Sequence, residues 1–188
     1  MTKLKLLTLF RSKQRGSSFI ELLVAMVILV IGLIGIFNLH LIAKQGSFES
    51  YQQTQAAYLA HDILNRMKLN RDGLAGYAGT YTGVLTQPTS LCDQLTSNCD
   101  SVTMRSADLF QWEQMLKGSA EKEGSRDVGG LDTPTACITI NGRDVAVAIT
   151  WKGIRKLSDG ATAHYTNVPA CGDAGVQRRM YAVVTVIR

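Results

Sequence analysis

The residues best suited to chemistry lie near the N-terminus, in the segment Arg15-Gly16-Ser17-Ser18-Phe19-Ile20-Glu21. Gly16 is a cleavage-like feature, but it lies before an apolar run, whereas a secretory signal has its small-residue cleavage site after the run. A cut between Gly16 and Ser17 would leave the apolar segment on the product. Glu21 would then hold a carboxylate near the membrane edge, where ionisable groups are costly and therefore indicate function.

The segment that follows predicts a membrane-spanning helix. From Phe19 to Phe37 every residue except Glu21 is apolar or Gly, which is close to the ~20 residues that cross a bilayer. The leader, Met1 to Gly16, holds no acid, and by the positive-inside rule it should stay in the cytoplasm. Its basic residues are Lys3, Lys5, Arg11, Lys13 and Arg15. The alternative is an uncleaved signal anchor, in which Glu21 only extends its carboxylate toward water.

Four cysteines form an even set, as a disulfide framework requires. Most of the chain is expected to be exported, where disulfides form, and the sequence alone permits three pairings. We favour Cys92 with Cys99, which closes a short local loop, and Cys137 with Cys171, which ties a long irregular segment to a strand. Zinc binding is the competing interpretation, but the ligand spacing typical of zinc sites is absent.

The remaining polar residues do not predict an enzyme. His164 lies in an expected loop with Thr162 and Tyr165 nearby. No nucleophile motif, phosphate loop, metal-binding His pair or pair of acids accompanies it. We therefore expect a solvated histidine and no catalytic residue.

Metal binding has little support in the sequence. His40 and His61 lie on or near the long helix without a second ligand at suitable spacing. The loop Gly172-Asp173-Ala174-Gly175, with Asp159 earlier, could offer oxygen ligands to calcium, but it does not reproduce a known calcium-loop pattern. Its glycines fit turn geometry without a metal. We expect no metal and no cofactor.

The charge balance reflects membrane topology. The chain has 20 basic and 15 acidic residues, a net charge of +5 and a pI near 9.1. The leader alone holds five of the bases, so the processed chain carries 15 of each sign. This argues against nucleic-acid binding by bulk charge, although a local patch at Arg178 and Arg179 stays open. Loss of the leader leaves 172 residues, and those beyond Lys44 could form one compact domain.

A long helix must position these groups. After the membrane run, apolar residues recur at helical spacing and predict a stripe laid on a globular core: Ala56, Leu59, Ala60, Ile63, Leu64 and Met67. Gly73 and Gly76 mark the expected helix end. A continuous helix from Ser17 to Met67 would be about 75 Å long at ~1.5 Å per residue. Gly32 and Gly35 either permit close helix packing or are simply tolerated in a membrane helix.

The next segment, residues 73–105, is expected to be an irregular connector because glycines and a proline interrupt it. A short helix is predicted from about Ala107 to Lys117, with Ser106 or Asp108 as its cap. Trp112 on this helix is expected to fill the core.

Strands follow the helices. Ala136–Ile140 and Val145–Trp151, separated by Asn141-Gly142, predict a hairpin with a tight turn. Met180–Ile187 predicts another strand after a turn-rich loop. Because helix precedes strands and does not alternate with them, the order indicates an α+β fold with an antiparallel sheet packed on the long helix.

The N-terminal arrangement resembles the class III signal of type IV prepilins: a basic leader, Gly16, Glu21 as the fifth residue after the Gly, and a long apolar run. The resemblance implies that prepilin peptidase cuts after Gly16 on the cytoplasmic face and methylates the new N-terminus, Ser17. It implies a role for Glu21 in assembly. One departure is visible, since the family usually has Phe first after the cut.

The resemblance also implies a pilin fold with three divisions: a leader at 1–16, a transmembrane and filament-core helix at 17–42, and a periplasmic globular domain at 43–188. The stretch around Trp112 resembles minor pilins of the PilV kind. The implied function is priming of type IV pilus assembly, at or near the tip, after residence in the inner membrane. The implied partners are prepilin peptidase, other minor pilins, the major pilin and the inner-membrane assembly platform.

Two other functions stay open. The chain is also similar to a minor pseudopilin of type II secretion. Alternatively, the helix displays a binding module for DNA or surfaces. Motility, adhesion, DNA uptake and secretion are all compatible with the sequence.

Overall fold

The computed structural model describes residue 16 and residues 18–94, 97–161 and 170–188. The chain divides into two compact units, Met1–Lys44 and Gln45–Arg188. The elements, in order, are α1 (Phe19–Leu69), the 3₁₀ helix η1 (Arg71–Tyr77), β1 (Gly79–Tyr81), α2 (Ser101–Lys117), β2 (Lys122–Glu123), β3 (Arg126–Asp127), β4 (Thr135–Asn141), β5 (Asp144–Lys152) and β6 (Arg178–Val186). The α+β class is confirmed.

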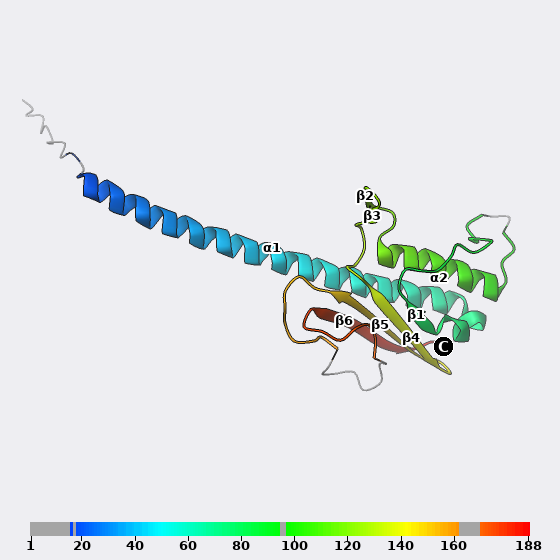
Figure 1. Cartoon of the computed structure of the whole chain (residues 1–188). Helices are drawn as coiled ribbons and strands as arrows, with labels where there is room; N and C mark the ends of the chain where they lie inside the picture. The colour runs from blue at the N-terminus through cyan, green and yellow to red at the C-terminus, as the bar shows by residue number, and fades with distance from the viewer. Residues whose placement is uncertain (1–15, 17, 95–96, 162–169) are drawn as a thin grey trace, which may run out of the picture. The chain divides into compact units, whose positions relative to one another are not determined.

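The second part of α1 forms the core of the unit Gln45–Arg188. All six residues of the predicted stripe are buried, each at most 2% exposed. They pack with apolar residues of α2 and the sheet, which lie on either side of the helix (Figure 1). The predicted amphipathic stripe is therefore confirmed.

The helix ends earlier than Gly73 and Gly76 suggested. Its last residue is Leu69, and both glycines lie inside η1. A Cβ on Gly73 would come within 2.9 Å of the carbonyl oxygen of Ser101. The glycine therefore serves the close approach of η1 to the start of α2 and does not stop α1.

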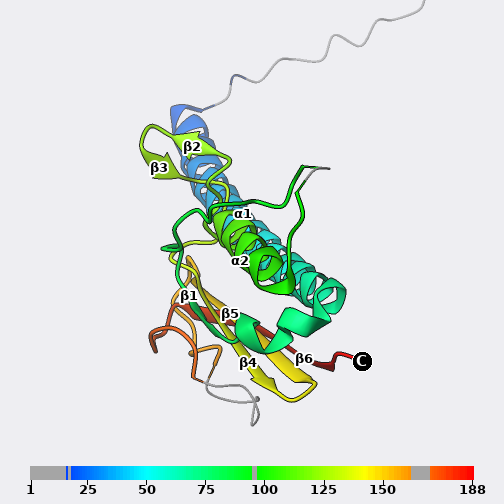
Figure 2. The same cartoon turned by 90° about the vertical axis from the view of Figure 1, so that its right-hand side faces the viewer.

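The main sheet is antiparallel, in the order β1-β4-β5-β6 (Figure 2). The predicted hairpin is confirmed: Asn141 pairs with Asp144 across the turn, and Gly142 has φ +61°. Alternate residues of β5 face the core shared with α1 because strand side chains have a period of two; they are Val145, Val147, Ile149 and Trp151. The predicted last strand is confirmed as β6, which pairs with β5 along its whole length.

Helix α2 is longer than expected. It starts at Ser101, and its cap is Asp100, whose Oδ1 accepts a hydrogen bond from Thr103 N at 2.8 Å. The expected caps, Ser106 and Asp108, are wrong because both lie inside the helix. The helix ends at Gly118 with φ +73°, a conformation that glycine adopts without a Cβ penalty.

Trp112 fills the core as expected. It is fully buried, and its indole Nε1 donates to the carbonyl oxygen of Leu59 on α1 at 2.8 Å. The edge of one ring meets the face of the other where Trp112 contacts Tyr81, with centroids 5.8 Å apart. Tyr81 lies in β1, within residues 73–105, which were expected to be irregular. With three residues, this strand is too short to show the alternation of apolar and polar residues that predicts a strand.

Candidate functional site

The first part of α1 presents an apolar surface. From Phe19 to Ile42 every residue except Glu21, Asn38 and His40 is apolar or glycine, and the large apolar side chains are all exposed. Among the described residues, α1 is the one helix long and apolar enough to cross a membrane, with a mean hydropathy of 2.9 in its most apolar window. Such a surface needs lipid or other helices to cover it.

Glu21 lies in the first turn of α1 and is exposed. The N–H groups of Glu21 and Leu22 donate to the carbonyl oxygen of Ser18 at 3.0 and 3.2 Å, so the helix begins immediately after Ser18. A carboxylate in the first turn suits the positive end of the helix dipole. Gly16 is exposed, and a Cβ built there meets no atom within 4 Å. Ser17 lies outside the described residues.

A carboxylate on α1 holds the loop after β5. The Glu49 carboxylate accepts from the Arg155 side chain at 2.6 and 3.0 Å and from the Arg155 backbone N at 3.0 Å. Arg179 adds a contact with Glu49 at 3.4 Å and donates to the Arg155 carbonyl oxygen at 2.7 Å. The Arg155 guanidinium lowers the pKa of Glu49 below its ordinary value. Glu49 was missed from sequence because its partners lie more than a hundred residues away.

A second ion pair organises the loop between β5 and β6. Arg178 donates to both carboxylate oxygens of Asp159, at 2.8 and 2.9 Å, and to the carbonyl oxygens of Cys171 and Gly172, each at 2.9 Å. The N–H of Gly175 donates to Asp159 at 2.9 Å. The Asp159 carboxylate and the Gly172 carbonyl oxygen, two of the oxygens that could have bound calcium, thus bind a guanidinium. Arg178 also holds the pKa of Asp159 far below its ordinary value.

The ion pairs of Arg178 with Asp159 and of Arg179 with Glu49 determine whether these arginines can form a basic patch. The side chains of Arg178 and Arg179 are 12% and 16% exposed and are held by carboxylates. Phosphate contacts need accessible cations. These two arginines therefore do not provide an open cationic surface for DNA.

The Asp159→Asn variant gives a prediction about pH. A carboxyl whose pKa is lowered by folding stabilises the native state above its unfolded pKa of about 3.9, and this contribution is lost as the pH falls. We expect the variant to be less stable than the wild type at neutral pH, with the gap narrowing progressively below about pH 5. Thermal unfolding across a pH series measures the gap, and a gap that stays constant contradicts the prediction.

A polar network joins the last turns of α1 to the middle of α2. Arg66 on α1 contacts Asp62 at 2.8 Å and reaches across to Asp108 and Gln111 on α2, both at 3.1 Å. Tyr77 donates to the other oxygen of Asp108 at 2.6 Å. Burial, reinforced by Asp108, raises the pKa of Tyr77. The phenol is therefore a fixed donor at neutral pH and not a base.

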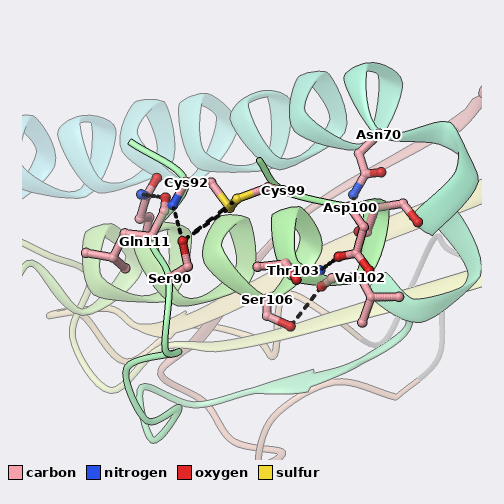
Figure 3. Close-up of a disulfide and its surroundings, with 11 residues drawn as sticks. Asn70, Ser90, Cys92, Cys99, Asp100, Val102, Thr103, Ser106 and Gln111 are labelled. Carbon is pink, nitrogen blue, oxygen red and sulfur yellow. Dashed lines mark hydrogen bonds between the residues drawn. A yellow bond between two sulfur atoms is a disulfide. The ribbon is translucent and has the colours of Figure 1, made fainter. Parts of the chain in front are cut away.

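Both disulfides favoured from the sequence are present. Cys92 bonds to Cys99 with a Cα–Cα distance of 6.1 Å, and Cys137 bonds to Cys171 at 5.8 Å. No thiolate is left to bind zinc, because all four cysteines are oxidised. Figure 3 shows the first bridge next to Ser90, whose hydroxyl lies within 4.0 Å of both sulfurs.

The first bridge also lies beside α2. Gln111 on this helix donates to the carbonyl oxygen of Leu91 at 3.1 Å. Asp100, the cap of α2, directly follows Cys99. The bridge therefore fixes the entry to α2.

Histidines do not form a metal site in the part of the chain that the structure describes. Across the described residues no three side chains of His, Cys, Asp or Glu gather in a metal-binding group. His61 lies 3.3 Å from the Tyr181 hydroxyl. His164, Thr162 and Tyr165 lie outside the described residues.

Comparison with known proteins identifies the N-terminal region. Residues 11–37 match the prokaryotic N-terminal methylation motif. No curated protein and no solved structure matches the chain. The matched range includes Gly16, Glu21 and most of the exposed apolar run. The motif implies processing by prepilin peptidase and points to a structural role, and together with the α+β fold it supports a type IV pilin-like or pseudopilin-like protein.

Proposed function

We propose that this chain is a minor type IV pilin of the PilV kind. Prepilin peptidase cuts it between Gly16 and Ser17 and methylates the Ser17 amine. Residues 17–42 span the inner membrane once, with residues 43–188 as the periplasmic domain. The processed subunit then joins other minor pilins and the major pilin on the assembly platform, and it primes a filament at or near the tip.

One observation carries this proposal: the range matched by the methylation motif ends within α1, and this helix continues, without interruption, into the core of an α+β domain. A simple signal anchor needs an apolar span but no such continuation. A helix that is apolar and exposed in one part and buried in a domain in the other suits a subunit that moves from lipid into a helical bundle.

Glu21 supplies specificity in this mechanism. In the membrane its carboxylate is poorly solvated, and the new amine at Ser17 of a neighbouring subunit offers a counter-charge. At ~4 Å such a pair attracts by ~4 kcal/mol with an effective dielectric of ~20, before desolvation is subtracted. Apolar contacts between helices supply cohesion, and the ion pair favours one register.

The Glu21→Ala variant should insert normally but fail to assemble. Its apolar run is intact, so membrane fractions should contain wild-type amounts. Loss of the ion pair should lower its amount in sheared filaments by about tenfold or more. Immunoblots of both fractions measure the ratio.

The Glu21→Gln variant is the matched control for side-chain size. It keeps the shape of the side chain without its charge, so it should assemble as poorly as Glu21→Ala. Wild-type amounts of Glu21→Ala in sheared filaments would refute the assembly role.

Crosslinking in cells separates this function from its closest alternative. A minor pilin should be recovered with pilus subunits. Recovery with components of an exoprotein secretion pathway would instead identify a type II minor pseudopilin.

A further inference from the structure

The last residue of β5 and the segment that follows it combine basic and apolar side chains. Together they read Lys152-Gly153-Ile154-Arg155-Lys156-Leu157 and are called the basic loop below. Ile154 and Leu157 are 47% and 48% exposed, and both lysines are exposed. Basic residues interleaved with exposed apolar ones are typical of segments that bind the surface of an anionic membrane.

The basic loop is held in place, so its exposed side chains are a fixed feature. Gly153 N donates to the carbonyl oxygen of Gln177 at 2.8 Å, and Leu157 N donates to that of Val176 at 2.8 Å. Between them, Arg155 is bound by Glu49 on α1. These bonds fix both ends and the middle of the loop.

The contact with Glu49 also sets the location of the basic loop within its unit. Glu49 lies in the first turns of the part of α1 that belongs to Gln45–Arg188. Phe48, the preceding residue, is 45% exposed and lines a hollow of about 890 Å³ together with Lys152 and Ile154. The exposed side chains of Phe48 and Ile154 therefore line the same hollow as Lys152.

The net charge around the basic loop is positive. Arg155 and Arg179 offset Glu49, and Arg178 offsets Asp159. Lys152 and Lys156 remain exposed. Three acids line hollows together with Lys152, namely Asp127, Asp132 and Asp173, and Asp127 is paired with Lys117. The surface thus complements a negatively charged partner.

The membrane is the negatively charged surface closest along the chain. Ile42, at the end of the apolar run, precedes Glu49 by seven residues in α1, about 10 Å of helix at ~1.5 Å per residue. The headgroup layer is about 5–8 Å thick on each side of the bilayer.

We propose that the basic loop docks on anionic phospholipid headgroups of the bilayer that holds α1, with Ile154 and Leu157 entering the interface and Lys152 and Lys156 contacting phosphates. This inference rests on the membrane anchor of the proposed function. Docking would fix the orientation of the domain before assembly, and extraction into a filament would release it.

The test uses the full chain in nanodiscs of phosphatidylcholine, with or without phosphatidylglycerol. Because all four native cysteines are oxidised, Ile154→Cys offers a unique thiol for an environment-sensitive fluorophore. In nanodiscs that contain phosphatidylglycerol, we expect the emission of the fluorophore at Ile154→Cys to rise and spin-labelled lipid to quench it. In phosphatidylcholine alone we expect neither change. The double change Lys152→Gln with Lys156→Gln, which removes two positive charges, should lower the ratio of docked to undocked protein by roughly thirtyfold.

Two labelled controls make the result specific. Val102→Cys carries the label in the first turn of α2, at a side chain of similar exposure, 52%. This turn lies near the C-terminal end of α1, because Asn70, the residue after α1, donates to the carbonyl oxygen of Ser101. It should stay unquenched. Ile31→Cys, within the apolar run, should be quenched in both lipids and reports the anchor alone.

The outcomes separate the inference from the function on which it rests. Quenching at Ile31 without quenching at Ile154 in either lipid overturns docking and leaves the anchor intact. Absence of quenching at Ile31 overturns both. If the fluorophore at Ile154→Cys is shielded from water in filaments but not in nanodiscs, the basic loop makes a contact between subunits. This result would likewise overturn lipid docking.

Discussion

The Gly16→Phe variant is expected to accumulate with residues 1–16 still attached. A peptidase must bring the scissile backbone into its active site, and a large side chain beside the bond obstructs that approach. Within this chain the substitution is harmless, since a Cβ at Gly16 meets no atom within 4 Å. The effect should therefore fall on processing and not on folding. Intact-mass spectrometry of the membrane-extracted protein measures whether the leader is retained.

Gly46→Phe is the matched control for this variant. Gly46 also has open space around its Cβ position, and it lies in α1 well away from the cleavage site. It should lose residues 1–16 as the wild type does. Loss of the leader from Gly16→Phe to the same extent as from Gly46→Phe would overturn the cleavage site, and with it the methylated N-terminus at Ser17.

Local patterns were enough to predict the helix and the hairpin. The stripe from Ala56 to Met67 repeats with the helical period, and its six members are buried because one face of α1 meets the sheet. Asn141-Gly142 indicated a tight turn, and Gly142, the first of the two residues between the paired Asn141 and Asp144, has φ +61°. In both cases the residues that decide the structure are neighbours in sequence.

Contacts between distant residues were beyond the sequence patterns. Glu49 and Arg155 are joined across 106 positions, and neither carries a local motif. Asp100 was missed as the cap of α2 because Ser101 to Ser106 lacks an apolar stripe, so the helix start was placed too late. The Arg178 to Asp159 pair was likewise hidden, since the two residues lie 19 positions apart and neither carries a local motif.

Glu113 is the most consequential of the residues that sequence patterns missed. It is fully buried on α2, next to Trp112. Its carboxylate accepts three backbone hydrogen bonds, from Thr82 N at 3.1 Å, Gly83 N at 2.8 Å and Leu85 N at 2.7 Å. One side chain thus holds the whole segment that leaves β1.

The Glu113→Ala variant should be destabilised by about 3 kcal/mol. Hydrogen bonds to a charged acceptor contribute about 1.5–3 kcal/mol each, but the segment from Thr82 to Leu85 lies partly at the surface, so its freed N–H groups regain water and the losses do not add fully. Urea unfolding of the full chain in detergent, followed by the fluorescence of the two buried tryptophans, Trp112 and Trp151, measures the change in unfolding free energy. Glu113→Gln should lose less, because its amide oxygen still accepts.

Glu123→Ala controls for the loss of a glutamate as such. Its side chain is 77% exposed and makes a single ion pair with Arg126 at 3.8 Å, so its removal should change stability by no more than about 0.5 kcal/mol. A Glu113→Ala variant as stable as Glu123→Ala would show that the segment after β1 does not depend on this carboxylate. The larger loss at Glu113 should also come with faster hydrogen exchange at Gly83 and Leu85, because their N–H groups lose their acceptor.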